Sequence, residues 1–312
     1  MKQNVAFLPY TTNPQYADLA LPRSSLNGKV ETSVYKLAGR AYLKLADRLD
    51  LTAYYKVDER DNKTPVDEYT PVMMDVFVSS PRSNRPYGSE RKQGVAELRY
   101  RPTYTIRLNA GIKRDERERT YQEIIKADED SYWGEIQFMA WSWLDTRLKY
   151  ESLKRDTDDH VQQGNYDRDE HPLMRKFNMA DRDRKRYTVE FNVTPMERMS
   201  VNLSWYQTSD DYDDSVIGLT DGEDSAINLD FNYLVGKETN LYLFVTQETI
   251  ESTLSGAGDV DDVPWNGFTE DDILTWGFGI SGRFTDKLTY GFDYVSSDAD
   301  GDIRVDSGAD EG

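Results

Sequence analysis

Hydrophobic and polar residues alternate along many stretches of this chain, and a period of two is typical of β-strands with two different faces. In one such stretch Val189 and Phe191 fall on one face, while Glu190 and Asn192 fall on the other. The alternation resumes after a short connector that contains Pro, as expected for two strands joined by a tight turn. The pattern therefore predicts a β-hairpin, and the chain repeats it.

The alternation predicts six hairpins, or about twelve strands, with connectors of two contrasting lengths. The short connectors are ADRLD (46–50), RPT (101–103), SWLD (142–145), TPMER (194–198), VGKET (235–239) and FTDK (284–287). The long polar stretches between hairpins are 61–91, 115–130, 156–184, 210–223, 253–271 and 297–312. Outer-membrane barrels have short periplasmic turns and long extracellular loops, whereas a soluble sandwich has no reason to place every long loop at one end.

These features predict an all-β fold, an antiparallel up-and-down transmembrane β-barrel. Residues 1–312 would form one partial barrel domain. No stretch approaches the roughly 18 consecutive apolar residues of a membrane helix, and a closed sheet is the other structure that satisfies its backbone in lipid. Hydrophobic content is only 38%, but aromatic content is 12%, and disordered chains are poor in aromatic residues. A soluble β-sandwich or solenoid is the alternative.

The two faces of each predicted strand have different chemistry. We expect these residues to face lipid: Val189, Phe191, Leu229, Phe231, Phe278 and Phe292. Besides Asn192, the candidate lumen residues are Lys36, Arg40, Lys44, Arg99, Arg107, Arg147, Lys149, Glu190 and Asp230. Charges of this density predict a lumen that holds water or a polar protein rather than packed side chains. An interfacial aromatic girdle is predicted from Trp133, Trp141, Trp143, Tyr100 and Tyr104.

The sequence offers no chemistry for catalysis, and we expect a protein that is not an enzyme. The absence of Cys excludes a cysteine nucleophile and the Cys-x-x-Cys-His attachment of c-type haem. His160 and His171 stand in one predicted loop, as ordinary loop residues or, alternatively, as part of a metal or haem contact. We therefore predict no catalytic, cofactor or metal site in this chain.

The acidic loops raise the question of calcium. Asp298, Asp300 and Asp302 resemble the start of an EF-hand loop, but Ile303 stands where Gly is needed and Ala309 where the bidentate Glu is expected. Solvated loop charge is the expectation, and weak divalent-ion binding is the alternative. Residues 210–224 carry seven acidic residues and no Lys or Arg, and we expect no nucleic-acid partner for such a surface.

Residues 1–25 lack the basic and apolar regions of a signal peptide. An outer-membrane protein needs one, so we expect that Met1 is not the natural start and that the chain is a fragment.

Several segments resemble the MtrB/PioB family of decahaem-associated outer-membrane barrels. They are AFLPYTTN (6–13), LPRSSLNGKVETSVYKL (21–37), DERDNKTP (58–65) and HPLMRKFNMADRDR (171–184). The resemblance implies a larger barrel in the bacterial outer membrane that acts as a sheath. A periplasmic multihaem c-type cytochrome would lie in the lumen and meet an extracellular multihaem cytochrome. Such a porin–cytochrome complex serves extracellular electron transfer, including metal reduction, and the partner carries the haem.

Two alternatives stay open. A diffusion porin or substrate channel would leave the lumen open to water, and a long loop folded inward to constrict the pore would favour it. The stretch 156–184, with its mixture of Arg and Asp, is the candidate for such a loop. A structural or adhesive surface barrel is the third possibility.

Overall fold

The computed structural model describes residues 2–4, 29–64, 66, 68–69, 72–73, 76–77, 82–83, 85–161, 171–212, 215–257 and 264–306. Its long strands are β2 (Lys29–Ala46), β3 (Leu49–Asn62), β8 (Ser89–Tyr100), β9 (Ile106–Arg119), β10 (Lys126–Trp141), β11 (Leu144–Thr157), β13 (Arg182–Met196), β14 (Met199–Asp211), β15 (Ile217–Val235), β16 (Thr239–Gly256), β17 (Trp265–Thr285) and β18 (Leu288–Asp306). The short ones are β1 (Lys2–Asn4), β4 (Glu68–Tyr69), β5 (Val72–Met73), β6 (Val76–Phe77), β7 (Arg82–Ser83) and β12 (Met174–Arg175).

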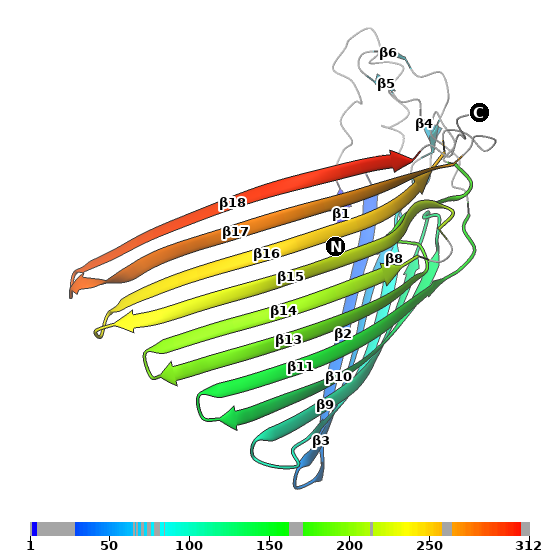
Figure 1. Cartoon of the computed structure of the whole chain (residues 1–312). Coiled ribbons are helices and arrows are strands. Elements are labelled where there is room, and N and C mark those ends of the chain that lie inside the picture. Colours follow the sequence, from blue (N-terminus) through cyan, green and yellow to red (C-terminus); the bar gives the residue numbers. More distant parts are fainter. Residues whose placement is uncertain are drawn as a thin grey trace.

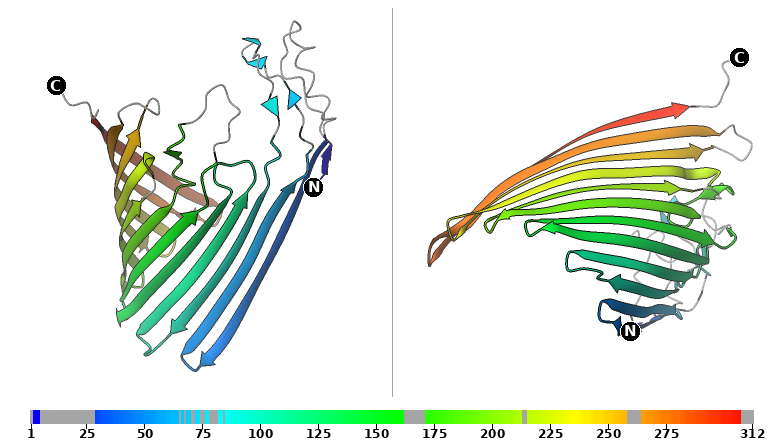
Figure 2. Two further views of the ribbon diagram at one scale, coloured as in Figure 1. Left: turned by 90° about the vertical axis from the view of Figure 1, so that its right-hand side faces the viewer. Right: turned by 60° about the horizontal axis from the view of Figure 1, so that its bottom comes forward.

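The long strands form one antiparallel sheet in which each pairs with the next along the chain. The sheet is tilted and curved but does not close on itself (Figures 1 and 2). β1 extends it beyond β2, β12 joins it through a parallel pairing with β15, and β4–β7 and β5–β6 form two small separate ladders. The prediction of about twelve antiparallel up-and-down strands is confirmed. Among the described residues no helix is long and apolar enough to cross a membrane.

All tight turns lie along one edge of the sheet, as predicted (Figure 2). The opposite loops are shorter than expected. β9 continues to Arg119 and β10 begins at Lys126, so most of the predicted loop 115–130 is strand. The flanking strands also extend into the ends of the other predicted loops, which are therefore shorter than predicted. These loops are 61–91, 156–184, 210–223, 253–271 and 297–312. Charged residues continue these strands because the loop-end halves contact water on the outward face and carry paired charges on the lumen face.

The lipid-facing band covers only the turn-end half of each strand. β17 has 21 residues, whereas a tilted strand crosses the bilayer with about 9–11. On its outward face Trp276 and Phe278 lie near the turn, while Glu270 and Asp272 stand farther along. Aromatic residues mark the loop-side boundary of this band on several strands, namely Tyr132, Tyr150, Tyr187, Trp205 and Tyr294. The loop-end halves therefore project beyond the membrane.

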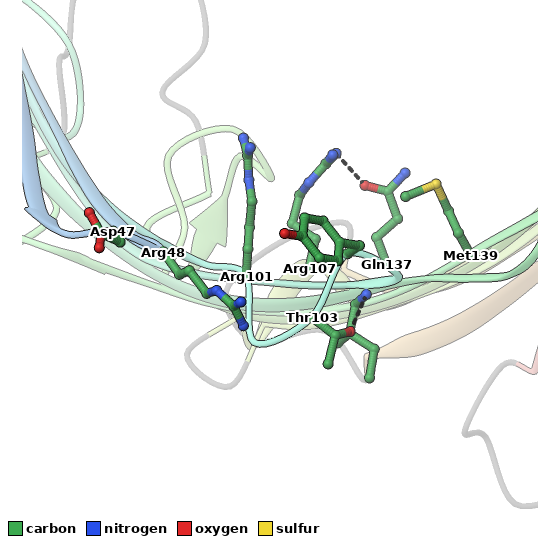
Figure 3. Close-up of a pocket in the computed structure, with 9 residues that line it drawn as sticks. Asp47, Arg48, Arg101, Thr103, Arg107, Gln137 and Met139 are labelled. Carbon is green, nitrogen blue, oxygen red and sulfur yellow. Dashed lines mark hydrogen bonds between the residues drawn. The ribbon is translucent and has the colours of Figure 1, made fainter.

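The strand register separates a polar face from an apolar one. Phe231 stands opposite Leu243, which in turn stands opposite Phe278. On the other face a polar row crosses the sheet through Arg107, Gln137, Arg147, Glu190, Ser204, Asn228, Thr246, Thr275 and Ser297. Figure 3 shows Arg107 and Gln137 on the concave side of the sheet, so the polar face lines the lumen.

Candidate functional site

The lumen face is the candidate functional surface, and the register places the predicted lumen residues on it. They are Lys36, Arg40, Lys44, Arg99, Arg107, Arg147, Lys149, Glu190, Asn192 and Asp230. The six residues predicted to face lipid lie on the opposite face. This sorting follows from the pleat, because residues two apart share a face and hydrogen-bonded neighbours stand side by side. Whether any of these lumen residues touches a partner stays a prediction.

Several of these side chains bind one another across strands. Arg107 Nη1 donates to Gln137 Oε1 at 2.7 Å, as Figure 3 shows. Arg147 forms an ion pair with Glu190 on the neighbouring strand. Lys149 Nζ lies 2.8 Å from Glu151 Oε2 on its own strand. The turn-end lumen wall is therefore held together by polar contacts rather than by a hydrophobic core.

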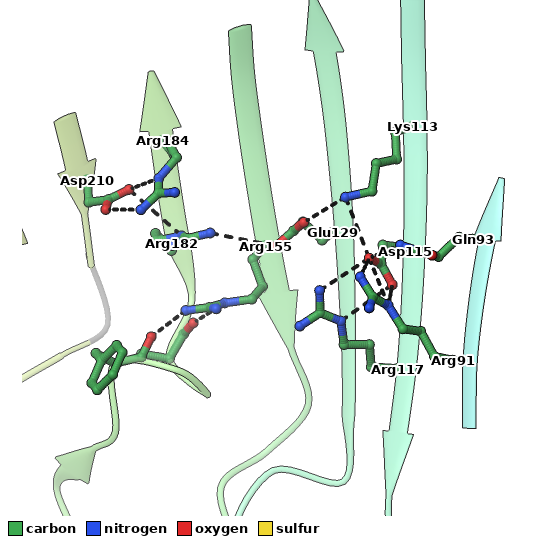
Figure 4. A network of polar contacts seen from close by, with 12 residues as sticks. Arg91, Gln93, Lys113, Asp115, Arg117, Glu129, Arg155, Arg182, Arg184 and Asp210 are labelled. Carbon is green, nitrogen blue, oxygen red and sulfur yellow. Dashed lines mark hydrogen bonds and ion pairs between the residues drawn. The ribbon is translucent and has the colours of Figure 1, made fainter. Parts of the chain in front are cut away.

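A denser network occupies the loop-end half of the lumen face (Figure 4). Its centre is Asp115, whose side chain is fully buried. The Asp115 carboxylate accepts hydrogen bonds from Arg91 Nε at 2.9 Å and Gln93 Nε2 at 2.8 Å, and Arg117 Nη2 donates at 3.2 Å. Lys113 Nζ stands 3.5 Å away. Burial removes water from the Asp115 carboxylate, and the surrounding cations and hydrogen bonds offset the energetic cost.

The same network continues across β10, β13 and β14. Glu129 lies 3.4 Å from Lys113 Nζ and 3.6 Å from Arg182 Nη2. Arg182 reaches Asp210 at 3.8 Å, and Arg184 Nε donates to Asp210 at 2.6 Å. Asp115 and Glu129 were predicted to lie in a loop, so the network could not be anticipated. Continuing the alternation of β9 and β10 by a few residues would have placed both on the lumen face.

Residues 171–181 fold inward and are anchored to this network. The guanidinium of Arg155, a lumen-facing residue, donates to Ala180 O at 2.7 Å and to Phe177 O at 2.6 Å. Asp181 Oδ1 accepts hydrogen bonds from the backbone and the hydroxyl of Thr157 at 2.6 and 2.7 Å. The Phe177 side chain is 62% exposed. Part of the stretch 156–184, the candidate constricting loop of the porin alternative, therefore lies against the lumen face.

A small hydrophobic core lies under this segment at the loop end. Its buried members are Ile124, Ala127, Leu153, Met179, Ala180, Tyr212, Ile217 and Ala226. Lys176 Nζ donates to Glu123 Oε1 at 2.7 Å and closes one side. Burial opposes ionisation of Glu123, but the hydrogen bond from Lys176, a backbone hydrogen bond and nearby positive charge together outweigh it, and the pKa of Glu123 lies below its ordinary value. Residues 171–181 therefore form a packed ledge, the inward ledge, on the lumen wall.

The lumen face of β15–β18 is built differently. Phe244 stands opposite Gly277, and Tyr242 opposite Gly279. A Cβ on Gly277 would lie 2.5 Å from the Phe244 ring, so each aromatic side chain covers a glycine of the next strand. Tyr242 Oη reaches across β17 and donates to Asp293 at 2.7 Å.

Charge divides the lumen face into two walls. The cationic wall is the lumen face of β8–β13, with Arg91, Arg99, Arg107, Lys113, Arg117, Arg119, Arg147, Lys149, Arg155, Arg182, Arg184 and Arg186. Its carboxylates are fewer: Glu97, Asp115, Glu129, Glu135, Asp145, Glu151 and Glu190. The acidic wall is the lumen face of β14–β18, with Asp210, Asp224, Asp230, Glu248, Asp271 and Asp293. On these five described strands Arg283 is the one lumen-facing cation.

The predicted aromatic girdle needs one correction. Trp141 and Trp143 stack at 5.3 Å at the turn end, where a girdle is expected. Trp133 instead lies on the lumen face, with its ring over Gly111 on β9. The signal was available, because Trp133 shares its parity with the polar residues Glu135 and Gln137 on the same strand.

The weaker sequence candidates do not converge into a site. Within the described residues no group of three or more His, Cys, Asp or Glu side chains could hold a metal ion. Asp298, Asp300 and Asp302 lie in the extended strand β18, all on its outward face, rather than in a loop that wraps around an ion. His171 Nδ1 accepts a hydrogen bond from the backbone of Leu173 at 3.2 Å.

Comparison with known proteins identifies the family. The sequence profile of the outer membrane β-barrel porin family MtrB/PioB matches residues 1–311. The chain belongs to the MtrB/PioB family. This membership places it in the bacterial outer membrane, as predicted. A curated relative, the outer membrane protein MtrB of Shewanella baltica (strain OS185), is 27% identical over 290 residues, which cover 92% of this chain. The chain spans 41% of that relative's length.

Solved structures with a similar fold include two mutants of the ferric enterobactin receptor PfeA of Pseudomonas aeruginosa. One aligns with a TM-score of 0.49 at 12% identity, covering 86% of this chain and 52% of the receptor chain. The other aligns with a TM-score of 0.46 at 12% identity, covering 87% and 50%.

Proposed function

We propose that this chain forms part of an outer-membrane sheath that encloses a multihaem c-type cytochrome and insulates it from lipid. Electrons would then pass across the outer membrane through the enclosed protein, toward or from an extracellular multihaem cytochrome. The barrel itself would be neither an enzyme nor a redox carrier. Membership of the MtrB/PioB family supports this assignment.

The observation that carries the proposal is the chemistry of the lumen face. Polar and charged residues line it across the sheet, as the row from Arg107 to Ser297 illustrates. A lumen of this kind does not fill with its own side chains, because unpaired charges are costly in a packed interior. It suits contact with water or with the hydrated surface of another protein. Mixed charge at such a contact contributes specificity more than raw affinity.

The test uses the full-length barrel purified from its native membrane. We expect the haem absorption band to co-purify with it. Reconstitution in liposomes that hold an internal redox dye should then give electron transfer to an external acceptor without leakage of the dye. A preparation that lacks haem and carries no electrons would reject the sheath.

A diffusion porin is the second candidate, and the inward ledge favours it. Residues 171–181 are packed against the lumen wall through Arg155 and Asp181, and an ordered inward segment is what narrows a pore. The liposome assay separates the two functions. A porin would release small solutes in the absence of haem, and the release would increase when residues 171–181 are deleted.

A further inference from the structure

The ion pairs of the cationic wall do not cancel its charge toward the lumen, because their carboxylates are the more buried partners. Asp115 is 0% exposed, whereas its partner Arg91 is 40% exposed. Glu190 is 22% exposed, against 42% for Arg147. A molecule in the lumen therefore meets guanidinium and ammonium groups first.

Apart from Asp210, which accepts hydrogen bonds from Arg184 of the cationic wall, the carboxylates of the acidic wall have no such cover. No Lys or Arg stands on the lumen face of the described strands β15 and β16. Asp224 and Glu248 each accept a hydrogen bond from Tyr206 Oη at 3.2 Å, and Asp293 accepts one from Tyr242. Hydroxyl donors satisfy these carboxylates without neutralising them. The two walls thus present charges of opposite sign to the same lumen.

We propose that the two walls fix how the enclosed cytochrome is rotated about the barrel axis, with an acidic surface of the cytochrome against the cationic wall. This inference rests on the proposed function and adds to it a docking surface and the chemistry of its partner. Screening limits such interactions to about 8 Å at physiological salt, so the selection acts between groups in near contact. A cytochrome turned to bring the acidic surface against the acidic wall would meet like charges, which disfavour that orientation.

Photo-cross-linking in the full-length complex tests the orientation. Thr188 on the cationic wall and Thr246 on the acidic wall are lumen-facing residues of the same type on well-separated strands. A photoreactive amino acid at each position should capture a different cytochrome peptide, and the peptide captured from position 188 should be rich in Asp and Glu. Capture of the same set of peptides from both positions would overturn the fixed orientation.

Charge reversal supplies the matched control, because Lys185 and Arg186 are neighbours that face opposite sides of β13. Arg186 lies over the ring of Tyr206 at 4.3 Å and faces the lumen, while Lys185 faces outward beyond the lipid band. Arg186→Glu should lower the ratio of haem to barrel after a salt wash, and Lys185→Glu should leave it unchanged. Equal retention in both variants contradicts the inference but leaves the sheath intact. Absence of haem from the parent protein rejects the sheath and the inference together.

Discussion

The cationic wall and the lumen face of β15–β18 hold their strands together with different chemistry. Both must be polar toward the lumen and must hold long strands together. The cationic wall uses a buried carboxylate, Asp115, with cations bound to it from β8 and from its own strand, β9. The β15–β18 wall uses aromatic rings laid over glycines, as in Tyr242 over Gly279, with hydroxyl groups bridging the strands.

The difference has consequences for how each wall tolerates change. An ion-pair network depends on every member, because removing one partner leaves the other charge uncompensated. An aromatic ring over glycine depends on space, because the glycine must lack a side chain. The first wall should therefore be sensitive to loss of charge, and the second to gain of volume.

The largest expected effect is on the cationic wall. Asp115→Ala leaves Arg91, Arg117 and Lys113 without their shared carboxylate, which should destabilise the folded sheet by about 2–3 kcal/mol, less than for a fully buried pair because the cations are partly exposed. Urea unfolding of the refolded barrel, followed by the gel mobility of the folded form, measures this. Asp293→Ala on the other wall is the matched control, and a loss as large as that of Asp115→Ala would contradict the contrast.

The complementary change adds volume to the β15–β18 wall. Gly277→Val places a Cβ 2.5 Å from the Phe244 ring and 2.8 Å from the backbone oxygen of Tyr294. Neither can move freely, so we expect a loss of about 1–3 kcal/mol. Gly291→Val is the control, because nothing lies within 4 Å of a Cβ there. Equal unfolding midpoints for the two variants would show that the ring over Gly277 is not packed as described.

Much of this architecture follows from the sequence because residues two positions apart on a pleated strand share a face. Alternate positions were sufficient to assign Glu190 and Phe191 to opposite faces. The strand ends could not be predicted in the same way. Beyond the lipid band the outward face contacts water and the lumen face carries a charged network, so a strand there has charges on both sides, as at Glu129 and Asp130, and resembles a loop. The girdle prediction was wrong for Trp133 because it rested on the residue type and not on the face that Trp133 shares with Glu135 and Gln137.

The inward ledge could not be predicted from the alternation of the sequence. Its anchors join residues far apart in the chain, such as Arg155 to Ala180 and Lys176 to Glu123. The small core beneath it collects single residues from several strands and connections. Periodicity is a local signal, and it carries no information on which distant loop covers which strand.

Removal of a single hydroxyl from the β15–β18 wall should lower the stability by a smaller amount. Tyr242→Phe keeps the ring over Gly279 but removes the 2.7 Å hydrogen bond to Asp293. We expect a loss of about 0.5–1.5 kcal/mol, the usual contribution of one hydrogen bond. The same unfolding assay measures it, and Tyr290→Phe is the control on the outward face, where it removes the 2.7 Å hydroxyl contact with Thr239. A loss for Tyr242→Phe as large as that for Gly277→Val would mean that the hydroxyl, rather than the ring, holds the wall.

The smallest effect concerns pH and the inward ledge. Because the pKa of Glu123 is lowered in the folded protein from an ordinary value of about 4.5, its pair with Lys176 stabilises the ledge above that value, and the contribution is lost as pH falls through the lowered pKa. Hydrogen exchange at the amides of Met179 and Ala180, which donate to Lys176 O, reports on the ledge locally. Glu123→Gln should exchange faster than the parent protein at pH 7, and the difference should shrink as pH falls below about 4.5 and vanish once Glu123 is protonated. Comparing parent and variant at each pH removes the intrinsic pH dependence of exchange. A difference that persists at low pH would mean that Glu123 supports the ledge through packing rather than through its charge.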